Sequence, residues 1–115
     1  MTHLNYDQLP ITLVALSEQT PVGMASLRIN DGIRPDLEPW LGSLVVHPKY
    51  RGSRVGERLI KAIEQEALAR GYEKLYLLAF DATIPNWYSR LGWKKMGTDE
   101  LFTHTVTVMQ LELEK

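Results

Sequence analysis

The stretch that most constrains the fold covers residues 41–69, LGSLVVHPKYRGSRVGERLIKAIEQEALA. A strand is predicted over 40–46, buried on both faces at its LVV end, and Pro48 ends it because proline cannot continue the ladder. Apolar side chains then recur every 3.6 residues, which predicts a long helix over 53–70. Free backbone N–H groups and the positive end of the helix dipole favour an anion at such a loop–helix junction.

The rest of the chain supplies further strands and one short helix. A hairpin is predicted from strands at 11–16 and 22–29, and another strand at 74–80. Pro85 begins a short helix that reaches about Arg90. Strands at 93–96 and 105–113, joined by a turn at 97–100, complete the order β-β-β-α-β-α-β-β. Strand 40–46, the long helix and strand 74–80 form a right-handed parallel βαβ unit. The order predicts an α/β (α+β) fold, a mixed sheet with helices packed on it.

Length and composition narrow the classes of function. A chain of 115 residues predicts one domain, 1–115, with 1–10 as a poorly structured lead-in. Net charge −1 gives no support for binding nucleic acid or a membrane surface. Cysteine is absent and the three histidines lack ligand spacing, so no metal site is predicted. No signal peptide or apolar span is evident, and we expect a cytoplasmic protein.

The first motif is RGSRVG at residues 51–56. Those six residues alone fit an ordinary turn glycine before a helix. However, Gly56 lies in the first helical turn, where glycine costs about 1 kcal/mol unless something must come close. Four cations also gather where the helix dipole opposes them: Lys49, Arg51, Arg54 and Arg58. An anionic ligand would relieve that conflict. The motif therefore fits a pyrophosphate cradle, although it is neither a P-loop nor a dinucleotide fingerprint.

The second motif is NWYSRLGW at residues 86–93. Adjacent residues on a helix cannot both point the same way, so Trp87 and Tyr88 face different surroundings. One of the two packs in the core, and Tyr88 faces a cleft if Trp87 is the core residue.

Together, LVVHPKYRGSRVGERLI and WYSRLGW resemble the GCN5-related N-acetyltransferase (GNAT) superfamily. The resemblance covers about residues 9–113, including the order of elements. The first motif resembles the family's acetyl-CoA loop, written [RQ]-x-x-G-x-[GA], and the second resembles its tyrosine-containing helix. The resemblance implies a largely antiparallel mixed sheet with a central splayed parallel pair and flanking helices. The N-terminal strand and helices of the family would be shortened or absent here.

The resemblance also implies roles for residues. The strand end would pair with the pantetheine arm through Leu44, Val45 and Val46. The loop N–H groups would hold the pyrophosphate, at Arg51, Gly52, Ser53, Arg54, Val55 and Gly56. Tyr88 would protonate the departing CoA thiolate. The implied reaction is transfer of an acetyl group from acetyl-CoA to an amine of a small molecule or peptide by direct attack, which requires an acid for the thiolate.

The sequence departs from the family pattern at several positions. Arg54 replaces the usual middle glycine of the loop, and Asp81 and Ile84 stand where many members have Asn and Ala. Strand 41–46 has no carboxylate where many members carry a Glu base. A water chain, Asp31 or Glu38 is left as the base. A non-catalytic acyl-CoA-binding or regulatory module is the alternative function.

Residues 1–10 are all that precede the first predicted strand, whereas family members usually begin with a strand and two helices that wall the acceptor site. Either the acceptor cleft is open, or a partner subunit completes it in a homodimer, or the chain is a shortened member. Trp40, Trp93 and Tyr50 would then be exposed candidates for a dimer contact or an acceptor wall. Alternatively, Trp40 and Trp93 cap the core.

Overall fold

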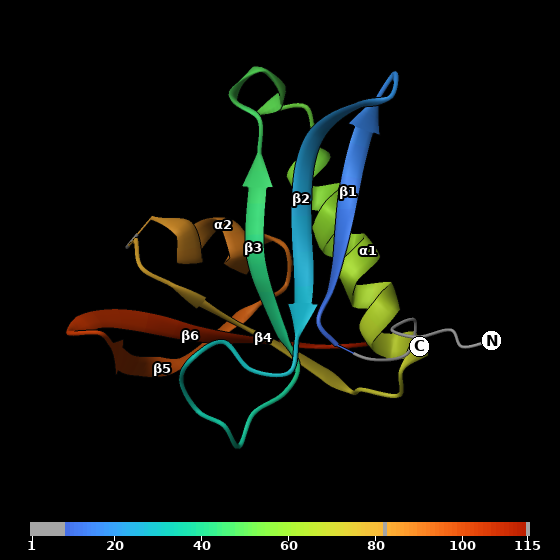
Figure 1. Ribbon diagram of the computed structural model, residues 1–115. Helices are drawn as coiled ribbons and strands as arrows, with labels where there is room; N and C mark the ends of the chain where they lie inside the picture. The colour runs from blue at the N-terminus through green and yellow to red at the C-terminus, as the bar shows by residue number, and fades with distance from the viewer. Residues whose placement is uncertain (1–8, 82, 115) are drawn as a thin grey trace.

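The computed structural model describes residues 9–81 and 83–114 (Figure 1). The elements confirm the predicted order, and they are β1 (Ile11–Ser17), β2 (Thr20–Arg28), β3 (Trp40–Val46), the 3₁₀ turn η1 (Pro48–Tyr50), α1 (Val55–Ala69), β4 (Lys74–Ala79), α2 (Ile84–Arg90), β5 (Lys94–Leu101) and β6 (His104–Glu112). Residues 1–8, most of the predicted lead-in, lie outside the described residues. Neither α1 nor α2 is long and apolar enough to cross a membrane.

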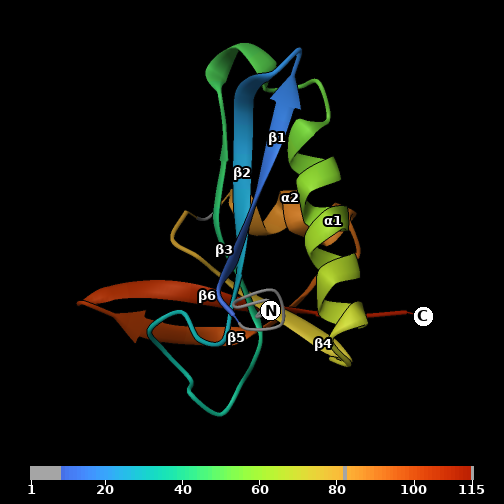
Figure 2. The ribbon, with the colours of Figure 1, turned by 45° about the vertical axis from the view of Figure 1, so that its right-hand side comes forward.

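The strands form one mixed sheet in the order β1-β2-β3-β4-β6-β5. Only β3 and β4 pair in parallel; the other neighbours are antiparallel. Figures 1 and 2 show β1, β2 and β3 running together, with β4, β6 and β5 crossing below them. Helix α1 lies along one face of β1–β3, and α2 lies beside the opening between the two halves of the sheet. The predicted mixed sheet with flanking helices is confirmed.

Two apolar clusters hold these layers together. The larger contains the buried stripe of α1, namely Leu59, Ile60, Ile63 and Ala67, together with buried residues of β2, β3 and β4. The smaller contains Trp40 and Tyr76, whose ring centroids lie 5.7 Å apart. The Trp40 indole donates to the carbonyl of Leu37 at 2.7 Å. Trp40 is 0% exposed and Trp93 2% exposed, so the expectation of exposed tryptophans is wrong and their alternative place in the core is confirmed.

The parallel pair is splayed, as predicted. Strands β3 and β4 pair at Trp40 and Tyr76, and Tyr76 N donates to Pro39 O at 3.0 Å. Beyond that point β4 leaves β3. The predicted burial of the LVV end on both faces is therefore wrong, and Val45 is 54% exposed. A run of apolar residues does not reveal whether the neighbouring strand continues beside it.

Two predicted boundaries are also wrong. The strand predicted at 93–96 is the longer β5, and its turn lies at Phe102 and Thr103 rather than at 97–100. Gly97 marks a register shift within β5, so this glycine belongs to a bulge and not to the turn. Helix α1 begins at Val55 rather than at 53, because Arg54 has a left-handed backbone (φ 69°, ψ 13°).

Candidate functional site

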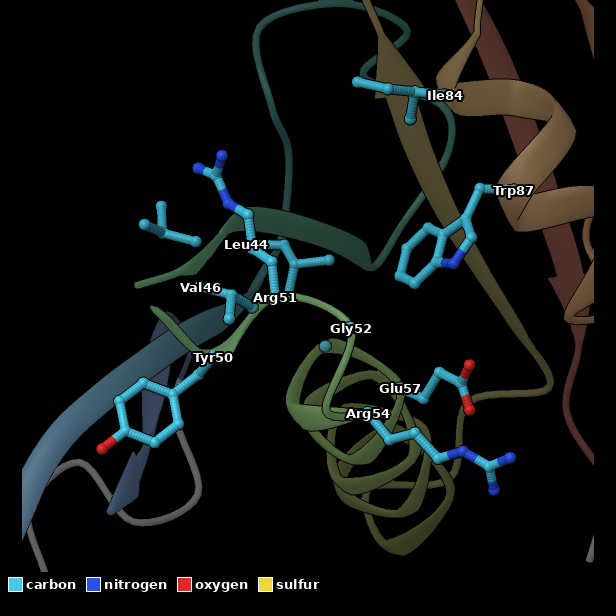
Figure 3. Close-up of a pocket in the computed structure, with 11 residues that line it drawn as sticks. Leu44, Val46, Tyr50, Arg51, Gly52, Arg54, Glu57, Ile84 and Trp87 are labelled. Carbon is cyan, nitrogen blue, oxygen red and sulfur yellow. The ribbon is translucent and has the colours of Figure 1, made fainter. Parts of the chain in front are cut away.

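A cavity of about 690 Å³ lies beside the end of β3 (Figure 3). Its walls come from β3, from the loop that leads into α1 and from the start of α2. The lining residues are Leu44, Val45, Val46, Tyr50, Arg51, Gly52, Arg54, Gly56, Glu57, Ile84 and Trp87. Of the predicted cofactor-binding residues, all line this cavity except Ser53 and Val55. The two ends of the predicted site are thus brought together around one space.

The first wall is a strand edge. His47 N donates to Val22 O at 2.8 Å, toward β2. Successive residues of an antiparallel strand direct their hydrogen-bonding groups to opposite edges, so those of Leu44 and Val46 face away from β2. The paired positions of β3 and β4 are Trp40 and Tyr76, and the edge at Leu44 and Val46 has no neighbouring strand in the described chain. An extended ligand that carries amide groups can pair with this edge.

A bulge sets that edge apart. Opposite β2, Gly42 pairs with Ser26 and Val45 pairs with Met24, so Ser43 and Leu44 together face one residue of β2. Ser43 has φ 54°, in the left-handed region. Bulges of this kind bend a strand and increase its local twist. The bulge lies between the paired part of β3 at Trp40 and its free end at Val46.

The second wall is the N-terminus of α1. The first backbone bond of the helix runs from Arg58 N to Arg54 O at 3.1 Å. Among the described residues, no partner accepts from the N–H groups of Arg54, Val55, Gly56 and Glu57. These are the orphan donors of a helix start, and they lie where the dipole is positive. The loop and the start of α1 also carry four exposed cations, which form no ion pair with a described carboxylate: Lys49, Arg51, Arg54 and Arg58. The arrangement favours an anion.

The two glycines of the RGSRVG motif, Gly52 in the loop and Gly56 in α1, have different roles. Gly52 has φ 86° and an added Cβ would meet nothing within 4 Å, so its backbone conformation requires glycine. An added Cβ at Gly56 would lie 3.4 Å from Trp87 Cη2 and 3.7 Å from Val46 Cγ2, which is ordinary contact. The protein's own atoms therefore leave room for a methyl group at Gly56, on the wall of the cavity.

Trp87 and Tyr88 divide between cavity and core. The half-buried Trp87 indole points from α2 into the cavity (Figure 3). Tyr88 is 6% exposed, and its ring centroid lies 4.9 Å from that of Trp87 and 5.6 Å from that of Trp93. Burial raises the pKa of Tyr88 to about 12. Tyr88 is therefore the core residue and Trp87 faces the cavity, which is the reverse of the alternative in which Trp87 is buried. The acid role of Tyr88 stays a prediction.

Three carboxylates considered at the sequence level differ in their surroundings. Asp31 is partly buried, and burial raises its pKa while nearby Arg28 lowers it. Glu38 is exposed. Asp81 accepts hydrogen bonds from Thr83 N at 2.8 Å and Thr83 Oγ1 at 2.9 Å, which lower its pKa. Asp81 therefore stabilises the turn that precedes α2. The described residues contain no group of three His, Asp or Glu side chains that could hold a metal ion.

The sequence also matches a known family. The family model described as "Acetyltransferase (GNAT) family" matches residues 2–93, which is well over half of the chain. The chain belongs to this family. A curated relative of this GNAT chain is the amino-acid acetyltransferase of Mannheimia succiniciproducens, which is 31% identical over 61 residues. That match covers 53% of this chain, and the chain spans 13% of the length of that relative.

Solved structures share the GNAT fold. A crystal structure of aminoglycoside 6'-N-acetyltransferase complexed with coenzyme A has a TM-score of 0.75 and 20% identity, over 96% of this chain and 76% of that one. The N-acetylglutamate synthase of Neisseria gonorrhoeae, complexed with coenzyme A and N-acetyl-glutamate, has a TM-score of 0.76 and 18% identity, over 90% of this chain and 26% of that one. These likenesses confirm the architecture predicted from the two motifs.

Four residues of the GNAT cavity were not singled out as cofactor-binding from the sequence: Tyr50, Glu57, Ile84 and Trp87. Glu57 and Tyr50 adjoin the RGSRVG motif, and their closeness in sequence was the available signal. For α2, the sequence leaves Trp87 and Tyr88 as alternatives for the core residue. Its direction depends on how α2 is rotated against Trp93, which helical spacing alone does not fix.

Proposed function

We propose that the protein is an acetyl-CoA-dependent N-acetyltransferase that moves the acetyl group to an amine of a small molecule or peptide by direct attack. One observation carries this proposal. The cavity joins a strand edge that has no neighbour in the described part of the chain to a helix start with orphan N–H groups and four nearby cations. Acetyl-CoA carries amide groups in its pantetheine arm and an anionic pyrophosphate, so one molecule satisfies both walls. Membership of the acetyltransferase (GNAT) family supports the same assignment.

The two walls support a position for the cofactor. The pantetheine amides pair with the backbone groups of Leu44 and Val46, while those of Val45, between them, face β2. The pyrophosphate accepts from the N–H groups that have no acceptor among the described residues, at Gly52, Arg54, Val55 and Gly56. Arg51 N instead donates to Pro48 O at 3.4 Å, and Ser53 N donates to Tyr50 O at 3.2 Å. A second cavity of about 590 Å³ shares Arg54 and Glu57 with the first and continues along α1 to Arg90. Its other cations are Arg58, Arg90 and Lys61, of which Lys61 pairs with Glu64 at 3.8 Å; they suit the nucleotide end of the molecule.

In the reaction, a neutral amine attacks the thioester carbonyl and the CoA thiolate leaves. Tyr88 is proposed as the donor to that thiolate. Burial raises the pKa of this phenol and keeps it protonated at physiological pH, so its hydroxyl can donate, although its ring lies in the core and does not line the cavity. The proton of the attacking amine leaves through a water chain or to a carboxylate of the β2–β3 loop, Asp31 or Glu38.

The acceptor class rests on the relatives. One acts on an amino acid and another on an aminoglycoside, and both of those compounds carry amines. An amine acceptor therefore suits this chain. A homodimer and a cytoplasmic location stay predictions.

The test combines binding with turnover. Titration calorimetry with CoA is expected to show binding, and a thiol assay is expected to show CoA release when acetyl-CoA is mixed with a panel of amines. Tyr88→Phe is expected to lose most of the turnover while its affinity for CoA stays within about twofold of wild type. Asn86→Ala, an exposed change on the same helix, is the control.

The outcomes separate the alternatives. Folded protein that binds CoA but turns over no amine supports a non-catalytic acyl-CoA-binding or regulatory module. Protein that binds no CoA contradicts both assignments. Full turnover by Tyr88→Phe removes Tyr88 from the reaction and leaves the acetyltransferase assignment in place.

A further inference from the structure

The bulge in β3 is held by a polar cluster on the face of the sheet opposite α1. Arg28 on β2 is its centre. Arg28 Nη2 donates to Ser43 Oγ at 2.7 Å, and Arg28 Nε donates to Ser26 Oγ at 3.1 Å. Ser26 is 1% exposed and donates to the carbonyl of Gly42 at 2.9 Å. Asp31 lies 3.7 Å from Arg28 Nη1. The cluster therefore ties β2 to two successive residues of β3.

Each contact bears on the bulge rather than on the regular ladder. Ser43 has φ 54°, a conformation that is costly for residues other than glycine, and its hydroxyl receives the shortest bond of the cluster. Gly42 leaves the space that the arginine fills, because an added Cβ there would lie 3.2 Å from Arg28 Cδ and Nε. Without Arg28, a hydrogen bond that favours the left-handed conformation of Ser43 is lost.

The bulge in turn decides where the free edge of β3 points. One residue beyond Ser43, the backbone of Leu44 begins the stretch that lines the cavity. A register shift of one residue exchanges the edges to which successive backbone groups point. Flattening the bulge would therefore turn the groups of Leu44 and Val46 away from the cavity.

We infer that Arg28 is a positioning residue, which holds the Ser43 bulge so that β3 presents its backbone to the pantetheine arm. This inference rests on the proposed function, since it concerns the same cofactor. The inference predicts that the two halves of CoA respond differently to the loss of Arg28. The cluster acts on the pantetheine half of CoA and leaves the helix start, which holds the phosphates, unchanged.

The test compares two ligands on the intact chain by titration calorimetry. CoA contains the pantetheine arm, whereas adenosine 3',5'-bisphosphate lacks that arm and the phosphate next to it and keeps the rest of the nucleotide end. Arg28→Met keeps most of the aliphatic stem and removes the guanidinium. We expect Arg28→Met to weaken CoA binding about tenfold, the scale of losing one charge-assisted hydrogen bond, and to leave adenosine 3',5'-bisphosphate binding within about twofold. Arg34→Met is the matched control, because Arg34 is as exposed as Arg28 (42%) and pairs with Asp36 in the next loop.

A second variant separates positioning from general stability. Glycine adopts φ 54° readily, so adding Ser43→Gly to Arg28→Met is expected to restore most of the CoA affinity. Unchanged CoA binding by Arg28→Met overturns the inference, and so does an equal loss for both ligands or an absence of rescue by Ser43→Gly. Wild-type protein that binds neither ligand contradicts the proposed function itself, so the two failures are distinct.

Discussion

Arg54 adopts a backbone conformation that favours glycine, at the position where the family loop usually has its middle glycine. Its φ of 69° places it in the left-handed region, and its side chain makes no capping hydrogen bond to α1. We predict that Arg54→Gly raises the free energy of unfolding by about 0.5–1 kcal/mol. Relief of about 1–2 kcal/mol of backbone strain is partly offset by the freedom of glycine in the unfolded chain. Urea denaturation measures the change.

The same substitution is expected to weaken CoA binding several-fold, because a cation leaves the cavity. Arg51→Gly is the matched control. Arg51 belongs to the same loop but has an ordinary backbone (φ −67°, ψ 138°), so glycine there relieves no strain. Equal stability changes for the two variants would contradict the assignment of strain to Arg54.

Tyr88 links stability to alkaline pH. Its pKa is raised by burial from 10.0 to about 12, so between those values the unfolded chain loses the phenolic proton and the folded chain keeps it. The contribution is complete below pH 10 and is lost as pH rises toward 12, by about 2–3 kcal/mol. We predict a steeper loss of stability over this range in wild type than in Tyr88→Phe, measured by urea unfolding at successive pH values. Parallel curves for the two proteins would show that burial does not hold this proton.

At the scale of elements, the first turn of α1 contains a glycine, Gly56, where a larger residue would favour the helix. Gly56 lies in a helical turn where alanine is favoured by about 1 kcal/mol, and an added Cβ would make ordinary contacts. We predict that Gly56→Ala raises the free energy of unfolding by up to about 1 kcal/mol and weakens CoA binding, because its methyl group occupies the cavity wall. Thermal unfolding and calorimetry measure the two effects.

Gly52→Ala provides the contrast for α1. An alanine at φ 86° is strained although its Cβ meets nothing, so the free energy of unfolding is expected to fall by about 1 kcal/mol. If Gly56→Ala left CoA affinity unchanged, the cofactor would not approach this turn.

The helices and strands also differ in how well the sequence predicts them. The stretch from β3 to β4 was predictable because proline and the helical period mark its boundaries. The turn predicted at Gly97 is wrong because a glycine bulge within a strand and a turn glycine look alike in sequence, and the pairing with β6 distinguishes them. The faces of Trp87 and Tyr88 depend on the rotation of α2 against Trp93, which is a tertiary contact. Most residues that line the cavity are predictable from the two motifs, but the bulge at Ser43 and its hydrogen bond from Arg28 have no local signal in the sequence.

At the scale of the whole molecule, a net charge of −1 conceals a strongly uneven distribution. Four cations lie around the loop and the start of α1, and the proposed ligand is an anion. We predict that CoA affinity falls several-fold between about 0.05 M and 0.5 M NaCl, because exposed charges are screened. Calorimetry at a series of salt concentrations measures this dependence. Binding of uncharged pantetheine is the control and is expected to change little; an equal salt effect on both ligands would contradict the role of the cations.

The pairing of β3 and β4 at Trp40 and Tyr76 has a consequence for the backbone hydrogen bonds of the free protein. Past Trp40 and Tyr76, the six strands of the described chain leave a gap between β3 and β4, and a bound pantetheine arm would lie there as a further strand. Binding of CoA would then change the hydrogen bonding of the β3 backbone. The amides of Leu44 and Val46 should exchange with deuterium rapidly in the free protein and slowly in the complex, while that of Tyr76, already bonded to Pro39, should not distinguish the two.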